Sequence, residues 1–293
     1  MLSLSSGLRG IVPVLKFRNT ADKKQVLEPQ YKGTLSDFCK KNQSGLLLNT
    51  LSMMEDLLHG ISTLHGISHP GVSYHNQKIQ TGPFNFTHFD IKPQNILVKM
   101  EEGKLRAVFT DFGGVDPGKL IFSDGYSSPE KIAFIMDYCI PMTGAIKPAA
   151  SSLQLTSSAI DFRRKYGAAS DIWALGLIFS VILVGHESDN GLCPLKCIEE
   201  AIQNPSKFKF PSGAGPYDVE TMVANLAQEK VDDSIADLKK ESLSKFDASD
   251  SAQINELWDL VTKMLQVDPK NRITHAAALS EFERITGKQV VVK

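Results

Sequence analysis

The sequence predicts an α+β fold that is poor in strands and rich in helices. Residues 96–99 and 105–110 are short apolar runs joined by a polar turn that contains Gly103, which indicates a β-hairpin. Residues 46–64 repeat Leu, Ile and Met at helical spacing. Residues 172–184 are apolar almost without a break, as expected of a helix in the middle of a large domain. These 13 residues fall short of the roughly 20 that cross a bilayer, so we expect no membrane span.

Residues 34–40 begin a short helix, for which Thr34 is a plausible N-cap. Composition and charge are ordinary for a globular protein. The chain has 293 residues, of which 42% are hydrophobic and 22% charged, and its net charge is -1. This charge gives no case for nucleic acid or an anionic membrane surface as a partner. The four cysteines form no C-x-x-C pair and no secretory pattern opens the chain, so we expect free thiols and a cytoplasmic protein.

The predicted hairpin brings polar side chains together. Asn95 enters its first strand and Asp111 leaves its second, so an antiparallel pairing places the two residues side by side. Asp90 lies on the loop just before. Hard divalent cations prefer oxygen ligands, so this end of the hairpin is a candidate cation site, with one carboxylate left to accept a proton.

Five segments carry a family resemblance. Residues 87–95 read T-H-F-D-I-K-P-Q-N and are followed by D-F-G from Asp111; they resemble the catalytic loop H-R-D-x-K-P-x-N and the D-F-G motif of protein kinases. Further motifs follow in the family's order: Y-S-S-P-E over 126–130, S-D-I-W-A-L-G over 170–176 and D-P-K-N-R over 268–272. The chain thus resembles the eukaryotic-type protein kinases, and Lys92 follows the serine/threonine-type pattern.

The resemblance implies a protein-kinase-like fold, mainly the helical large lobe (C-lobe), with only the last strands of the small lobe (N-lobe). Residues 10–17 look like the fourth N-lobe strand, and residues 25–29 look like the fifth strand running into the hinge. No G-x-G-x-x-G motif and no V-A-I-K-like lysine precede them. We therefore expect an N-lobe remnant over 1–30, a C-lobe over 31–286 with insertions at about 66–86 and 136–162, and a tail over 287–293.

The family's roles carry over by position. Asp90 would accept or orient the substrate's hydroxyl proton, and Lys92 would neutralise charge on the γ-phosphoryl group of ATP. Asn95 and Asp111 would hold Mg²⁺ against the phosphates. Phosphoryl transfer is mostly positioning and electrostatics, so these four side chains would carry the chemistry.

Further residues are expected to bind adenine or to brace the fold. The Glu28 carbonyl and the Gln30 amide fall where hinge contacts to ATP occur, with Leu97 beneath the adenine ring. Asp171 would cap the central helix and bind the catalytic-loop backbone, and Glu130 and Arg272 would form the family's buried ion pair.

One residue departs from the catalytic-loop pattern. Phe89 stands where most members have arginine, so the loop lacks a cation to pair with a phosphorylated activation segment. We infer that the protein, if active, is not switched on by phosphorylation of that segment.

Three functions remain open. The first is an ATP-dependent serine/threonine-type protein kinase that acts on a protein substrate, and in this hypothesis a partner chain could complete the N-lobe. The second is a truncated kinase or pseudokinase that works as a binding or scaffold module. The third, a small-molecule kinase of the aminoglycoside or choline type, is disfavoured by Lys92 and by the three downstream motifs.

Overall fold

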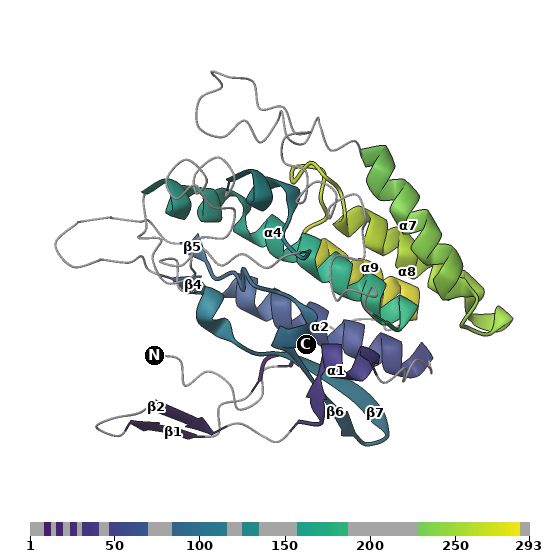
Figure 1. Cartoon of the computed structure of the whole chain (residues 1–293), viewed down its shortest axis with the longest axis horizontal. Coiled ribbons are helices and arrows are strands. Elements are labelled where there is room, and N and C mark those ends of the chain that lie inside the picture. The colour runs from purple at the N-terminus through teal and green to yellow at the C-terminus, as the bar shows by residue number, and fades with distance from the viewer. Residues whose placement is uncertain are drawn as a thin grey trace.

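The computed structural model describes most of the chain between residues 9 and 287. Within it the strands are few and short and the helices are long, as predicted for an α+β fold (Figure 1). The described ranges are 9–12, 16–19, 24–27, 31–40, 47–69, 84–115, 125–134, 157–186 and 228–287.

The described strands form small antiparallel sheets. β1 pairs with β2, β4 pairs with β5, and the largest sheet has the order β3-β6-β7. The strands are β1 (Lys16–Asn19), β2 (Lys24–Leu27), β3 (Gly33–Thr34), β4 (Ser68–His69), β5 (Phe84–Asn85), β6 (Ile96–Glu101) and β7 (Lys104–Phe109).

The predicted hairpin is confirmed. β6 and β7 are in register from Ile96 opposite Phe109 to Glu101 opposite Lys104. The turn between them consists of Glu102 and Gly103, both with left-handed backbone, as a tight two-residue hairpin turn requires. The two ends of the hairpin also meet as expected, because the Thr110 N–H donates to the Asn95 carbonyl at 3.0 Å.

The helices form the bulk of the molecule (Figure 1). α2 lies between the β6–β7 hairpin and α4, and α8 and α9 pack beside them, with α7 against α4 and α8. The helices are α1 (Leu35–Lys40), α2 (Leu47–Gly66), α4 (Ser157–Val184), α7 (Gln228–Leu243), α8 (Ser251–Met264) and α9 (His275–Thr286), with 3₁₀ turns η1 (Pro93–Asn95), η2 (Phe112–Val115) and η4 (Ala248–Asp250).

Both helices predicted before the hairpin are present. α2 matches the apolar stripe over 46–64 to within two residues at its end. Thr34 caps α1, because its Oγ1 accepts the Asp37 N–H at 3.1 Å while Asp37 Oδ2 accepts the Thr34 N–H at 3.0 Å. The two hydrogen bonds satisfy donors that the first turn of a helix leaves without partners.

The central helix is longer than the sequence indicates. α4 begins at Ser157, so the expected cap, Asp171, lies in the middle of the helix, and that prediction is wrong. Residues 160–184 are long and apolar enough to cross a bilayer, so the expectation of no membrane span can no longer rest on the shortness of the apolar run. Every residue from Asp171 to Val184 is nevertheless buried among protein side chains. Such burial is typical of a core helix in a water-soluble domain, so the span is weak support for membrane insertion.

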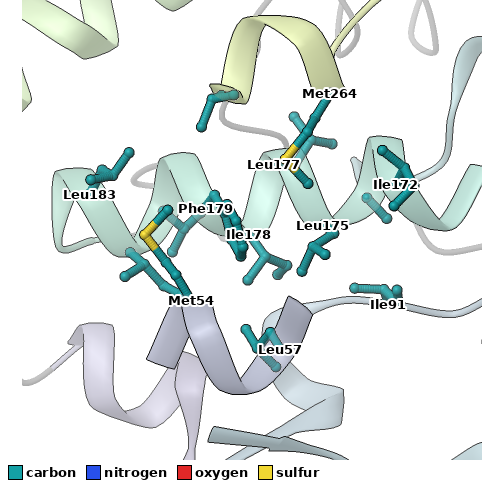
Figure 2. Packing of buried hydrophobic residues seen from close by; sticks show 14 of the residues in the cluster. Met54, Leu57, Ile91, Ile172, Leu175, Leu177, Ile178, Phe179, Leu183 and Met264 are labelled. Atoms are coloured by element: carbon teal, nitrogen blue, oxygen red, sulfur yellow. The ribbon is translucent and has the colours of Figure 1, made fainter. Parts of the chain in front are cut away.

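The core is built around this helix. In Figure 2, α4 runs between α2 and α8, with Leu175, Ile178 and Phe179 on the α4 segment between Met54 of α2 and Met264 of α8. These side chains are fully buried, so each removes its apolar surface from water.

Residues 9–12 are attached to the hairpin and to α2. The Phe109 N–H donates to the Gly10 carbonyl at 2.9 Å, and the Val12 N–H donates to the Phe109 carbonyl at 3.0 Å. The Arg9 guanidinium pairs with Asp56 at 2.8 Å. Of the strand expected over 10–17, the structure describes an isolated bridge at Ile11 and the first two residues of β1, and residues 13–15 lie outside the described residues. The strand expected over 25–29 corresponds to β2.

A buried ion pair joins two distant parts of the chain, as expected. Arg272 Nη1 and Nη2 donate to the two carboxylate oxygens of Glu130 at 2.7 and 3.1 Å, and both side chains are 0% exposed. Ser170 Oγ donates to the same carboxylate at 3.0 Å. The pair ties helical residues 129–134 and α4 to the turn before α9.

Removal of the cation from this pair should destabilise the fold strongly. In Arg272→Met the Glu130 carboxylate would keep Ser170 but lose its counter-charge, and stranding a buried charge costs about 3–5 kcal/mol. We expect this loss in the free energy of urea unfolding. The control is Lys263→Met, which breaks the exposed pair with Glu281 and should cost under about 1 kcal/mol. Equal costs for the two variants would contradict the assignment.

Gly60 of α2 should resist a substitution that normally stabilises helices. Gly-to-Ala within a helix usually gains about 0.5–1 kcal/mol. A Cβ at Gly60 would lie 2.6 Å from the Gly10 carbonyl oxygen and 2.9 Å from the Phe109 ring, so residues 9–12 would have to move. We expect Gly60→Ala to lower the urea midpoint and to speed tryptic cleavage at Arg9.

Gly66→Ala is the matched control for this variant, because nothing lies within 4 Å of its added Cβ. It should be neutral or slightly stabilising. A rise in the midpoint for Gly60→Ala would show that residues 9–12 do not need the close approach.

Candidate active site

One carboxylate on α4 holds the loop that precedes β6. The backbone N–H groups of His88 and Phe89 donate to the two oxygens of Asp171, each at 2.7 Å. His65 Nε2 shares a third hydrogen bond with this carboxylate at 3.0 Å. The expectation that Asp171 binds the catalytic-loop backbone is confirmed.

These donors keep Asp171 charged inside the protein. Burial alone raises the pKa of the Asp171 carboxyl, but the hydrogen bond with His65, the nearby imidazoles of His65 and His88 and the Phe89 N–H together lower that pKa below its ordinary value. The loop is therefore attached to an ionised carboxylate, which makes stronger hydrogen bonds than a neutral acceptor would.

Asp90, Lys92 and Asn95 form one hydrogen-bonded cluster. Lys92 Nζ donates to Asp90 Oδ2 at 2.8 Å. The Asn95 amide nitrogen donates to the same oxygen and to the Asp90 carbonyl, both at 2.9 Å. η1 makes this possible, because one 3₁₀ turn folds Asn95 back toward Asp90. Asp90 is 4% exposed, so its carboxylate is fixed by these neighbours.

Asp111 lies at the other end of the hairpin with left-handed backbone (φ 55°). Its Oδ1 accepts the Gly113 N–H at 3.3 Å, and its side chain is exposed. Within the described ranges the side chains of Asn95 and Asp111 make no hydrogen bond to each other, and only their backbones are linked, through Thr110. Because the Asn95 nitrogen is committed to Asp90, its amide oxygen is the atom that could face a cation together with the Asp111 carboxylate. This donor set fits Mg²⁺, which prefers oxygen ligands.

His88 connects the loop to the segment that carries Asp111. Its ring lies 5.5 Å from the Phe109 ring and 5.3 Å from the Phe112 ring, measured between centroids. Its Nε2 donates to the Thr110 carbonyl at 3.0 Å, so the proton sits on Nε2. Burial lowers the pKa of His88, despite the opposing charge of Asp171, so the imidazole is neutral.

The residues expected at adenine are only partly described. Leu97 is half-buried on β6, opposite Thr34, and points away from the face on which Ile96 and Val98 are buried. Glu28 and Gln30 lie outside the described residues. Leu97 therefore remains a prediction for the adenine site, as do the two hinge residues.

Sequence reasoning missed three residues that support the loop. His65 binds Asp171, Lys131 Nζ donates to the Phe89 carbonyl at 2.6 Å, and Arg163 donates to the Thr87 carbonyl at 2.9 Å. His65 ends the apolar stripe of α2, a position from which a contact with Asp171 could have been proposed. No sequence pattern points to the other two.

Sequence comparison relates the chain to known kinases. No protein-family model matches it. It is 24% identical over 273 residues to the phosphorylase b kinase gamma catalytic chain, liver/testis isoform, of Bos taurus, which covers 90% of this chain and 48% of that protein. It is 28% identical over 202 residues to protein kinase gsk3 of Schizosaccharomyces pombe (66% of this chain, 41% of that protein). It is 28% identical over 232 residues to mitogen-activated protein kinase hog-1 of Neurospora crassa (76% and 54%).

The chain spans about half the length of the curated relatives it matches. Its helices and small three-stranded sheet are compatible with a protein-kinase-like fold. The motifs, the anchored loop and these similarities agree with one another. The chain is therefore a relative of the eukaryotic-type serine/threonine protein kinases.

Proposed function

We propose that this protein is an ATP-dependent serine/threonine-type protein kinase, which transfers the γ-phosphate of Mg-ATP to a hydroxyl group of a protein. The observation that carries the proposal is the cluster of Asp90, Lys92 and Asn95, fixed by three hydrogen bonds at the end of the hairpin that leads to Asp111. Such a cluster brings together, within one loop, a carboxylate that can accept a proton, an ammonium group and an amide.

Each member of the cluster has a separate task in this proposal. The Asp90 carboxylate accepts or orients the hydroxyl proton of the substrate, so that the hydroxyl oxygen attacks phosphorus. The Lys92 ammonium, held 2.8 Å from Asp90, stabilises negative charge on the transferred group. The Asn95 nitrogen keeps the Asp90 carboxylate in place, as in other sites where geometry contributes much of the rate.

Asn95 and Asp111 would hold Mg²⁺ through their oxygen atoms. The ion, when bound, neutralises charge on the phosphates. For the nucleotide we propose Leu97 beneath the adenine, with the Glu28 carbonyl and the Gln30 amide at its edge. We further propose that residues 31–286 form the C-lobe and residues 1–30 part of the N-lobe, as in the kinase relatives.

The alternative is a kinase-shaped protein that only binds partners. The sequence before Asp90 contains no G-x-G-x-x-G motif, and that loop covers the ATP phosphates in protein kinases. The four catalytic positions are all filled by the residues that phosphoryl transfer uses, which favours the enzyme. Catalysis and nucleotide binding therefore need separate tests.

Loss of the Asp90 carboxylate should slow phosphate transfer strongly. Asp90→Asn keeps the size of the side chain but removes its charge and its capacity to accept a proton. We expect transfer of labelled phosphate from Mg-ATP to a generic basic protein to fall by about 10²–10⁴-fold. Asp259→Asn is the matched control, since Asp259 is 66% exposed on α8 and should leave the rate unchanged. Equal activity in wild type and Asp90→Asn would remove the enzyme assignment.

Nucleotide binding should require the metal and Asp111. At about 100 times its dissociation constant, a ligand stabilises the native state by about 2.7 kcal/mol. For a domain of this size that corresponds to a rise of about 5 °C in the melting temperature. We expect this rise with ATP and Mg²⁺ together, and a much smaller one with ATP in EDTA or in Asp111→Asn. A rise without phosphate transfer would support the binding module instead.

A further inference from the structure

Phe89, the residue before Asp90, has a backbone conformation that its own side chain disfavours. Its φ is +62°, in the left-handed region, where a bulky residue is rare and must be held by its surroundings. Its ring is 2% exposed. The position of Asp90 therefore depends on whatever holds Phe89.

Lys131 holds Phe89 from one side. Its ammonium lies 4.1 Å from the centre of the Phe89 ring and donates to the Phe89 carbonyl at 2.6 Å. A cation over an aromatic face is attracted by the ring, more strongly where water is excluded. Lys131 is itself 4% exposed, so this contact is shielded from bulk solvent and holds both the ring and the backbone of Phe89.

Arg163 of α4 also faces the ring, and it binds two chain segments. Its guanidinium carbon lies 4.8 Å from the centre of the Phe89 ring. Its Nε donates to Thr87 Oγ1 at 3.0 Å, and its Nη2 donates to the carbonyls of Thr87 and Gly114. Gly114 approaches the loop so closely that an added Cβ would overlap the His88 carbonyl. Arg163 thus joins the start of the catalytic loop to the residue that follows D-F-G.

Two buried cations at one aromatic ring carry an energetic cost, because charges leave water. The anions that act on Lys131 are Asp90 of the loop and Asp171 of α4, both buried. Loss of water lowers the pKa of Lys131 to about 8, which the charges of Asp90 and Asp171 partly oppose. Strongly perturbed groups beside a candidate catalytic residue often serve that residue.

We propose that Lys131 and Arg163 are positioning residues, which hold Phe89 between them and thereby fix Asp90 and the start of the activation segment from inside the domain. They supply the positive charge that the catalytic loop lacks at position 89. The inference rests on the proposed kinase function and gives a structural reason for the expectation, drawn from Phe89, that phosphate transfer does not need phosphorylation of the activation segment.

The test compares neighbouring arginines on one helix, in protein treated with a phosphatase and then freed of it. Arg163→Met removes the buried guanidinium, whereas Arg164→Met removes an exposed one with 42% accessibility. We expect phosphatase-treated wild type to be active. We expect kcat to fall about 10–100-fold in Arg163→Met and Lys131→Met, with the KM for ATP within about threefold, since misplaced catalytic groups lower kcat. A kcat within about twofold of wild type in both variants would overturn the proposal.

Hydrogen exchange tests the position of the loop without a measurement of phosphate transfer. The N–H groups of His88 and Phe89 donate to Asp171, so they should exchange about tenfold faster in Arg163→Met and at the wild-type rate in Arg164→Met. If wild type transfers no phosphate, the proposed function fails, and this exchange comparison alone decides whether Arg163 positions the loop. Unchanged exchange in Arg163→Met would refute a positioning role for Arg163.

Charge-conserving variants cover the case in which the methionine variants do not fold. A lysine at this position can replace one of the three hydrogen bonds that Arg163 makes with Thr87 and Gly114. We therefore expect Arg163→Lys to lose less kcat than Arg163→Met, at an unchanged melting temperature. Full activity in Arg163→Lys would count against a positioning role for Arg163.

The pH profile gives a second signature. Lys131 loses its charge as the pH rises through its pKa of about 8. The charged groups that act on it are Asp90, Asp171, Arg163 and Lys92. In wild type kcat should fall through this pH range, whereas Lys131→Arg stays charged and should lose this alkaline limb. The same limb in both proteins would contradict a role for the Lys131 charge.

Discussion

The arrangement of the site depends on one buried carboxylate. Asp171 lies in the middle of α4, at the start of a stretch that is buried throughout, and accepts hydrogen bonds from the consecutive backbone N–H groups of His88 and Phe89. Buried N–H groups need partners, and an ionised acceptor binds them more strongly than a carbonyl does. A loop of irregular backbone can therefore be buried here without loss of its hydrogen bonds. Together with the contacts of Lys131 and Arg163, this attachment holds the left-handed Phe89 next to Asp90.

The interior of the helical part of the molecule holds several charges, each with a partner of opposite sign or a ring. Glu130 pairs with Arg272, and Arg272 also lies 5.0 Å from the Trp173 ring. Lys131, the next residue after Glu130, turns instead toward the catalytic loop. Two adjacent residues thus connect the buried ion pair with Arg272 on one side to the candidate site on the other. Because buried charges are costly to separate, the ion pair and the loop restrict each other's movement.

Local patterns in the sequence were sufficient for part of this structure. The β6–β7 hairpin, α2 and the Thr34 cap were predicted from residue spacing, whereas the Glu130–Arg272 pair was implied by the resemblance to protein kinases. The start of α4 could not be found in this way. Residues 151–158 are rich in Ser and Leu without helical periodicity, and the first turns of α4 are held by contacts such as that of Arg163 with Thr87. Tertiary contacts of this kind override local propensity. The burial of Lys131 was equally hidden, because its partners come from a segment about 40 residues away in sequence.

The added length of α4 explains how one helix can organise the whole loop. Arg163, Gly167 and Asp171 are four residues apart, so they lie along one face of the helix, about 6 Å between neighbours. Arg163 binds Thr87, a Cβ at Gly167 would touch the Thr87 side chain at 3.0 Å, and Asp171 binds His88 and Phe89. The contacts of this face therefore follow the loop in the same direction, from Thr87 to Phe89. A helix that began at Asp171 would hold the end of this stretch and leave Thr87 without the contacts from Arg163. The start of α4 at Ser157 thus adds the contacts of Arg163 with Thr87 to those that Asp171 makes with the candidate catalytic loop.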